Sequence, residues 1–411
     1  MTPHDDARPA RSRWAAVGML AVGTFAIGTD GFVVAGVLGG IAGDLSVPAA
    51  AAGQIVTVFA LAYALGSPLL STLIGGRRQL PVLVGALVLF AVFNVLAALA
   101  PALGLLVAAR VLCALAAAAY TPAAGAAAAA MVPPAYRGRA LAVVLGGMSV
   151  ATVVGAPVGI AVAGMGSWRW TFVLVAALSV LAATGLLLMR PPVGAAVRRP
   201  LAQRLLPLRH RAVPAALGVT LLGMAAGYGI YTYLDPIFAP EPGVGRGALG
   251  LLVAVHGLGG LIGTWAGGTL ADRWGPYRTV LVALTLVTVV FAVSPLIGST
   301  LPGAVAFLFL WGVTGWAFVP AQQHRLVGID PEHAPLLISL NSSAVYIGIA
   351  AGGLGGGLIV AAAGADRLWI WAVGCCVAAV ALQALTGRLS ARSGGPRSPH
   401  AAPAASAARE G

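Results

Sequence analysis

Long apolar stretches recur along the whole chain, and short segments that contain arginine or proline separate them. Each stretch has about 20 residues or more, the length that an α-helix needs to cross the hydrocarbon core of a bilayer. The strict alternation of apolar and polar residues that is typical of a membrane β-barrel is absent. The pattern predicts twelve membrane-spanning helices, at residues 14–38, 50–74, 80–99, 102–131, 140–163, 170–189, 213–235, 248–270, 278–298, 302–326, 335–363 and 366–388.

One long polar connection, residues 190–212, divides these spans into two sets of six and carries six arginines. The expected organisation is all-α: an N-terminal tail, a first helix bundle, this basic linker, a second bundle and a disordered tail rich in Ser, Ala, Pro and Arg. The corresponding ranges are 1–13, 14–189, 190–212, 213–388 and 389–411.

The composition agrees with a protein that lies in the bilayer. Hydrophobic residues make up 59% of the 411 residues and charged residues only 9%, whereas about a quarter of a soluble domain is charged. The net charge of +13 would suit a nucleic-acid partner, but the arginines are spread over the gaps between apolar stretches and form no single soluble face. We therefore expect the lipid bilayer, and no nucleic acid, as a partner.

The distribution of arginine predicts the orientation. All 24 basic residues are arginine, and twenty of them lie in cytoplasmic segments if both termini are cytoplasmic. The outer loops then hold three, Arg169, Arg246 and Arg367. Because cytoplasmic loops of membrane proteins carry the excess of positive charge, we expect a multi-pass protein of the cell membrane with both termini in the cytoplasm.

Two glycine-containing motifs suggest helix packing and gating. Residues 268–278, after the eighth span, fit the pattern G-x-L-x-D-R-x-G with a trailing arginine, and their candidate gating residues are Gly268, Asp272, Arg273, Gly275 and Arg278. Asp272 is expected at a helix end, paired with arginines of neighbouring segments. The equivalent segment 71–78 keeps two arginines but has glycine in place of the aspartate.

The fifth span contains Gly155, Pro157 and Gly159. Glycine permits close helix packing and proline interrupts the hydrogen-bond ladder, so this stretch predicts a bendable, closely packed helix. The alternative interpretation is a simple proline kink.

Together these features resemble the major facilitator superfamily. The two sets of six spans, the basic linker and the 268–278 motif match that family, and residues 155–159 are similar to the glycine–proline motif of its exporters, with Ala156 as an extra residue between glycine and proline. Segments 28–36, 168–172, 231–236 and 341–343 resemble the drug:proton antiporters with twelve spans, among them bacterial arabinose-efflux and chloramphenicol-resistance permeases. The resemblance implies two pseudo-symmetric six-helix bundles, a monomer, alternating access and no cofactor or metal.

Asp30 and Arg110 are the first candidates for proton coupling. Asp30 lies eight residues before the end of the first span and Arg110 eight residues after the start of the fourth, so both are about 12 Å from the outer end of their helices. An aspartate in this environment costs about 2.5–3.5 kcal/mol on insertion scales. We interpret the two as a conditional ion pair that protonation of Asp30 weakens; the alternative is a permanent structural salt bridge.

His256 in the eighth span lies at a similar depth and is the second candidate for the proton, because histidine titrates near physiological pH. A hydrogen bond to a neighbouring group is the alternative. Aromatic residues are expected to line a cavity for amphipathic or weakly cationic molecules, although each also suits packing: Tyr63, Tyr228, Tyr231, Trp316 and Tyr346. Asp235, at the outer end of the seventh span, is a candidate mouth residue; solvent exposure without a function is the alternative.

The function expected is proton-driven export of a small organic molecule, such as a drug, antibiotic or metabolite, by alternating access, with that molecule and protons as partners. A facilitator or a proton-coupled importer of a sugar or metabolite is the alternative on the same fold. An enzyme is not expected, because no G-x-S-x-G, H-E-x-x-H or paired membrane aspartates occur, and no P-loop indicates an ATP-driven pump.

Overall fold

Twelve helices in the described part of the chain are long and apolar enough to cross a membrane, as the sequence predicts. The computed structural model describes residues 10–194, 206–238, 244 and 248–393. The main helices of the first half are α1 (Ala10–Asp44), α2 (Ala49–Leu73), α3 (Gln79–Ala98), α4 (Leu103–Met131), α5 (Arg137–Val150), α6 (Ala156–Gly164) and α7 (Arg169–Met189). Those of the second half are α9 (Ala212–Tyr231), α10 (Leu234–Phe238), α11 (Leu249–Trp274), α12 (Pro276–Ile297), α13 (Leu301–Ile329), α14 (Ala334–Ala363) and α15 (Leu368–Ser393).

The predicted tails and linker fall partly on residues 1–9, 195–205 and 394–411, which lie outside the described residues. Within the described part, α1 already begins at Ala10 and α15 continues to Ser393. The first and last helices are therefore longer than the predicted spans. The seventh predicted span, 213–235, is divided into α9 and the short helix α10.

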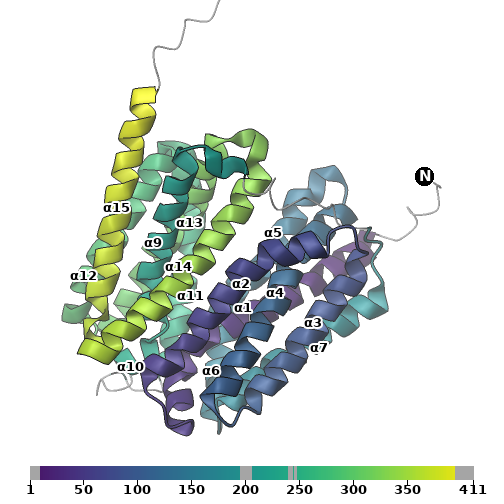
Figure 1. The fold of residues 1–411 in the computed structure, drawn as a ribbon, viewed down its shortest axis with the longest axis horizontal. Coiled ribbons are helices and arrows are strands. Elements are labelled where there is room, and N and C mark those ends of the chain that lie inside the picture. Colours follow the sequence, from purple (N-terminus) through teal and green to yellow (C-terminus); the bar gives the residue numbers. More distant parts are fainter. Residues whose placement is uncertain (1–9, 195–205, 239–243, 245–247, 394–411) are drawn as a thin grey trace, which may run out of the picture.

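The helices form two bundles that lie side by side, α1–α7 and α9–α15 (Figure 1). We call the face on which α1 begins and α15 ends the terminal face, and the opposite one the α10 face. The bundles meet through α2 against α14, through α1 against α10, and through α11 against the fifth span. Toward the terminal face the bundles lean away from each other (Figure 1).

The fifth span is interrupted by one π-helical turn, Ala151–Gly155, between α5 and α6. Pro157 lies in the first turn of α6. Because proline has no N–H and its ring collides with the carbonyl four residues earlier, the preceding turn widens. Isolated π turns of this kind are frequent at functional sites. This one touches both α1 and α11: a methyl group at Gly155 would collide with Thr29, and one at Gly257 with the carbonyl of Thr152.

Small residues bring α11 and α13 into backbone contact. Gly259, Gly263 and Gly267 follow each other by one helical turn, and a methyl group at any of them would overlap a backbone carbonyl of α13. Tight contacts of this kind supply much of the packing energy between membrane helices, since burial from lipid gives none.

On the α10 face, Asp235 lies between the bundles. Its carboxylate accepts a hydrogen bond from the backbone N–H of Gly39 in α1, and only 2% of its surface is exposed. The solvent exposure considered as the alternative for Asp235 is therefore wrong. The cause is α10, which folds the chain back against α1 instead of continuing α9 outward.

Candidate functional site

The structure brings Asp30 and Arg110 together in the interior of the first bundle. Arg110 Nη1 donates to both carboxylate oxygens of Asp30, at 2.6 Å each. The exposed fractions of the two side chains are 0% and 1%. Counting residues from the helix ends predicted this shared depth, because α1 and α4 are antiparallel and in contact.

Aromatic rings enclose the guanidinium group. The Cζ atom of Arg110 lies 4.4 Å from the centre of the Phe59 ring and 5.6 Å from that of Phe172. Cation–π attraction is strongest where water is excluded, so these rings help to keep the cation in the bundle. The Nε atom of Arg110 is buried without a hydrogen-bond partner in the described part of the chain. The ion pair therefore leaves part of the donor capacity of the guanidinium unused.

Arg110 also lines a central cavity of about 270 Å³ between the bundles. Four of the five aromatic residues predicted to line a cavity do so here: Tyr63, Tyr228, Trp316 and Tyr346. Tyr63 of α2 and Tyr346 of α14 stack with ring centres 3.7 Å apart, so they join the two bundles at the cavity wall.

The remaining lining residues were not predicted as a set. Phe32, Phe59 and Met224 add apolar surface, and polar groups come from Thr121, Ser149, Gln323, Asn341 and Ser342. The helical spacing in the sequence could have indicated several of them. Phe59 and Ser342 each precede a predicted tyrosine by four residues, and Gln323 follows Trp316 by seven, so each pair shares one helix face.

The charge on the described cavity wall is positive. Among the described lining residues Arg110 is the only one with a formal charge, and no carboxylate lines the cavity. Asp30 balances that charge from behind. The walls therefore offer hydrogen bonds, aromatic faces and a guanidinium edge, but no anionic partner for a cation.

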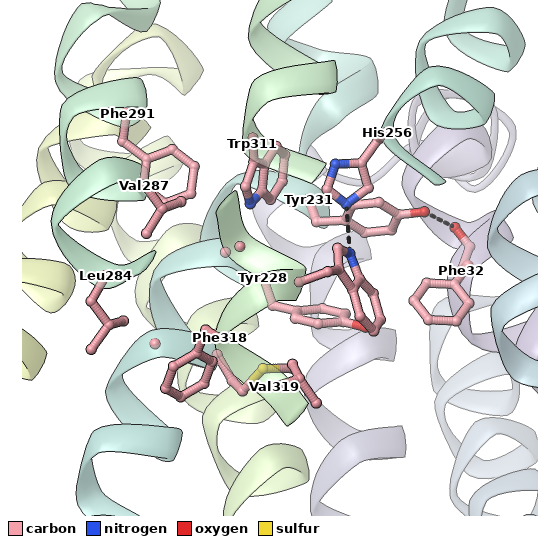
Figure 2. A pocket seen from close by; sticks show the side chains of 15 residues that line it. Phe32, Tyr228, Tyr231, His256, Leu284, Val287, Phe291, Trp311, Phe318 and Val319 are labelled. Atoms are coloured by element: carbon pink, nitrogen blue, oxygen red, sulfur yellow. Dashed lines mark hydrogen bonds between the residues drawn. The ribbon is translucent and has the colours of Figure 1, made fainter. Parts of the chain in front are cut away.

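A smaller aromatic pocket of about 60 Å³ adjoins the cavity inside the second bundle (Figure 2). The two share Phe32, Met224, Tyr228, Trp316 and Val319. His256, the second proton candidate, lines this smaller pocket and not the central cavity.

Both ring nitrogens of His256 have hydrogen-bond partners. The indole N–H of Trp316 donates to Nε2 at 3.4 Å, and Nδ1 lies 3.3 Å from the carbonyl oxygen of Leu308. Because an indole N–H only donates, Nε2 must accept, and the hydrogen on Nδ1 then points to Leu308. This arrangement fits a neutral imidazole that orients Trp316. It corresponds to the alternative given for His256 in the sequence analysis, a hydrogen bond to a neighbouring group.

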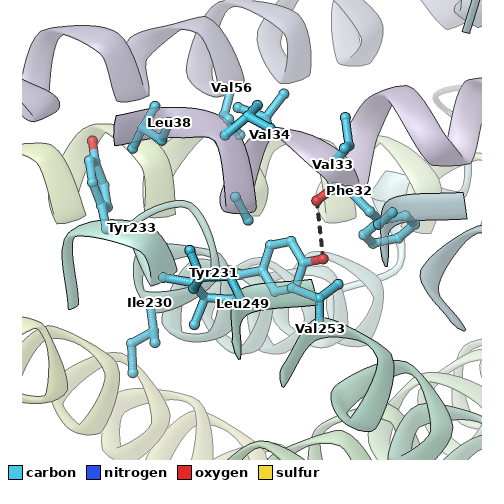
Figure 3. Close-up of a cluster of buried hydrophobic side chains, with 14 of the residues drawn as sticks. Phe32, Val33, Val34, Leu38, Val56, Ile230, Tyr231, Tyr233, Leu249 and Val253 are labelled. Carbon is cyan, nitrogen blue, oxygen red and sulfur yellow. Dashed lines mark hydrogen bonds between the residues drawn. The ribbon is translucent and has the colours of Figure 1, made fainter. Parts of the chain in front are cut away.

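Tyr231 borders the smaller pocket, and its hydroxyl donates to the backbone carbonyl of Phe32 at 3.2 Å (Figure 3). Around this bond, buried apolar side chains from both bundles meet: Val33, Val34 and Leu38 of α1, Val56 of α2, and Leu249 and Val253 of α11. This cluster separates the cavity from the α10 face.

The residues of the 268–278 motif lie at the terminal face. Asp272 is 77% exposed, and its nearest ionisable partner is His324 of α13, with Nδ1 and Oδ1 3.7 Å apart. The predicted pairing of Asp272 with arginines is absent from the described part of the chain. Asp272 instead meets α13 of its own bundle, and the two bundles lean apart toward this face. Gly275 ends α11 with a φ of +83°, a conformation that favours glycine.

Among the described residues, no group of three or more His, Cys, Asp or Glu side chains is arranged to hold a metal ion. The cavity walls offer aromatic faces, hydrogen-bonding groups and the guanidinium group of Arg110, and the carboxylate of Asp30 lies behind that group.

Comparison with known proteins identifies the family of this chain. The family profile described as "Major Facilitator Superfamily" matches residues 20–352. The uncharacterized MFS-type transporter YbcL of Bacillus subtilis is 31% identical over 365 residues, which is 88% of this chain and 93% of that protein. A chloramphenicol efflux pump of Mycobacterium tuberculosis is 33% identical over 358 residues, with 83% and 84% of the two chains covered.

A solved structure shows the same fold. A bacterial homologue of the human lysosomal transporter Spinster, crystallised in an inward-facing and occupied conformation, superposes with a TM-score of 0.75. The superposition covers 93% of this chain and 98% of that one, at 19% sequence identity.

Proposed function

The chain belongs to the major facilitator superfamily of multi-pass membrane transporters, and from this premise we propose that it is a proton-driven exporter of a small organic molecule. The observation that carries the proposal is the ion pair of Asp30 and Arg110 at the wall of the central cavity. Two opposite charges inside a membrane bundle are costly and are characteristic of proton relays and ion pathways.

Protonation of Asp30 is the proposed coupling step. A proton on the carboxylate removes the charge that holds Arg110 Nη1 and leaves the guanidinium free to reorient in the cavity wall. Deprotonation restores the pair. A substrate that binds better to one of these two states exchanges for the proton, which is the requirement for coupled antiport.

The arrangement of the bundles suits uptake from the cytoplasm. By the distribution of arginine, the terminal face is the cytoplasmic one. The apolar cluster around Tyr231 and the contact of Asp235 with Gly39 close the cavity toward the opposite face. Alternating access then requires that these contacts separate while the bundles close at the terminal face.

The cavity favours a neutral amphipathic molecule with an aromatic ring. The aromatic walls suit a ring, and the hydroxyl and amide groups of Thr121, Ser149 and Asn341 suit polar substituents. A cation would meet Arg110 and, among the described lining residues, no carboxylate. Neutral molecules therefore fit the cavity better than the weakly cationic drugs that the sequence analysis included. The named activity of the mycobacterial relative, chloramphenicol efflux, is consistent with this chemistry.

Inverted membrane vesicles with a pH-sensitive dye test the proposal. Phenicols, cationic dyes, sugars and nucleosides are added to wild-type vesicles and to vesicles with Asp30→Asn. We expect proton release on addition of a neutral aromatic compound, and its loss in the variant. If a compound crosses the membrane and no proton moves, the protein is a facilitator. If a sugar and protons cross in the same direction, it is a proton-coupled importer.

A further inference from the structure

A separate hollow lies on the outer surface of the first bundle, away from the substrate cavity. It is a groove of about 530 Å³ between α2, α3 and α4. Its walls are apolar, with Leu89 and Leu112 facing outward, at 50% and 38% exposure. Gly85 lies along the groove, and a methyl group added there would have open space around it. The hollow thus faces the hydrocarbon of the bilayer.

Two arginines, Arg77 and Arg78, close the groove at the terminal face. They lie in the turn between α2 and α3, where Gly76 has a φ of +84°, and both are exposed. Neither forms an ion pair within the described part of the chain. This turn is the one in which glycine replaces the aspartate of the second-half motif, and residues 45–234 contain no acidic residue at all.

The dimensions of the groove match one lipid chain. Along α3 it extends from Pro81 to Phe93, twelve residues or about 18 Å of helix. One leaflet of bilayer hydrocarbon is about 15 Å thick. A chain lying in the groove therefore ends near the bilayer centre when its headgroup is at the arginines.

We propose that this groove binds an anionic phospholipid, with the headgroup phosphate on Arg77 and Arg78 and one acyl chain between α2, α3 and α4. The two guanidinium groups supply the charge complementarity, since arginine binds phosphate through paired N–H donors. With the terminal face cytoplasmic, the lipid belongs to the inner leaflet. The site is independent of the substrate cavity and of proton coupling.

Native mass spectrometry of the purified protein tests the site with phosphatidylglycerol and with phosphatidylcholine of the same acyl chains. We expect wild type to retain phosphatidylglycerol preferentially. The double variant Arg77→Gln/Arg78→Gln should lower that affinity about 10- to 30-fold, the loss of two arginines near an anionic headgroup. Gly85→Leu places a side chain in the groove at a position where the added Cβ meets open space, and should lower the affinity as well.

The second half of the chain supplies the matched control. Arg273→Gln/Arg278→Gln removes the same charge from the equivalent turn, where Asp272 is already present, and should change the affinity by less than about twofold. Equal losses in the two double variants would mean general attraction between a basic face and anionic lipid and would overturn the proposal. Equal retention of both lipids by wild type would overturn it too.

Discussion

At the scale of single residues, the buried carboxylate of Asp30 needs Arg110 for the stability of the fold. Removing one member of a buried ion pair leaves the other charge uncompensated, at a cost of about 3–5 kcal/mol. We therefore expect Arg110→Ala to lower stability by that amount at neutral pH, and by less at low pH, where a proton neutralises Asp30. Unfolding in a detergent series at several pH values measures the difference.

The double variant Asp30→Asn/Arg110→Ala is the control for this prediction. It contains neither charge, so it should recover part of the lost stability and show no dependence on pH from this pair. An Arg110→Ala protein as stable as wild type at every pH would show that Asp30 does not need the guanidinium.

A second residue-scale prediction concerns His256. Its ring accepts from Trp316, which borders both pockets, so His256→Phe should weaken substrate binding about fivefold, the usual worth of one hydrogen bond of about 1 kcal/mol. The pH dependence of transport should stay that of wild type. Loss of that dependence in the vesicle assay would instead assign the proton to His256.

The sequence predicted part of this site for a simple reason. Charges are rare in apolar helices, so Asp30 and Arg110 stood out and counting gave their depth. The burial of Asp235 and the exposure of Asp272 could not be predicted in the same way, because both depend on how neighbouring helices are placed. The partners of His256 come from α13, about 50 to 60 residues further along the chain.

At the scale of helices, the contact between α11 and α13 gives a sharp prediction. A methyl group at Gly263 overlaps the carbonyl of Val313, whereas one at Gly268 has open space. Gly263→Ala should therefore cost about 1–3 kcal/mol of stability through overpacking. Gly268→Ala, five residues away on the same helix, should stay within about 0.5 kcal/mol. Equal unfolding midpoints of the two variants would contradict the observed approach of the helices.

Helix positions were the most predictable feature, because a span of about 20 apolar residues has few alternatives in a membrane. The exceptions have local causes. Pro157 widens a turn of the fifth span, and the chain bends after Tyr231 to form α10. Periodicity does not report the π-helical turn, since the apolar stretch continues through it.

At the scale of the whole molecule, the contact between Asp235 and Gly39 should favour the form that is closed at the α10 face. Asp235→Ala removes this contact and should raise the fraction of molecules open at that face. Spin labels at Ser46 and Ser299, exposed positions in α10-face loops of the two bundles, report the distance between bundles. A growing population at longer distance is expected, and an unchanged distribution would show that the apolar cluster alone keeps this face closed.

The packing of the two bundles was not derivable from hydrophobic pattern alone. Composition and periodicity gave twelve helices in two sets, and only the resemblance carried by residues 155–159 and 268–278 implied how the sets assemble. The stacking of Tyr63 on Tyr346 and the shape of the cavity follow from contacts between helices distant in sequence.

Calorimetry of substrate binding shows whether Asp30 exchanges its proton for substrate. A compound that the vesicle assay identifies is titrated into purified protein in buffers of different ionisation enthalpy, which gives the protons released per molecule bound. We expect proton release from wild type that grows as the pH falls into the range where Asp30 is protonated. We expect no release from Asp30→Asn, which still binds the compound. The same release from the variant, or binding to wild type without release at any pH, would contradict this exchange.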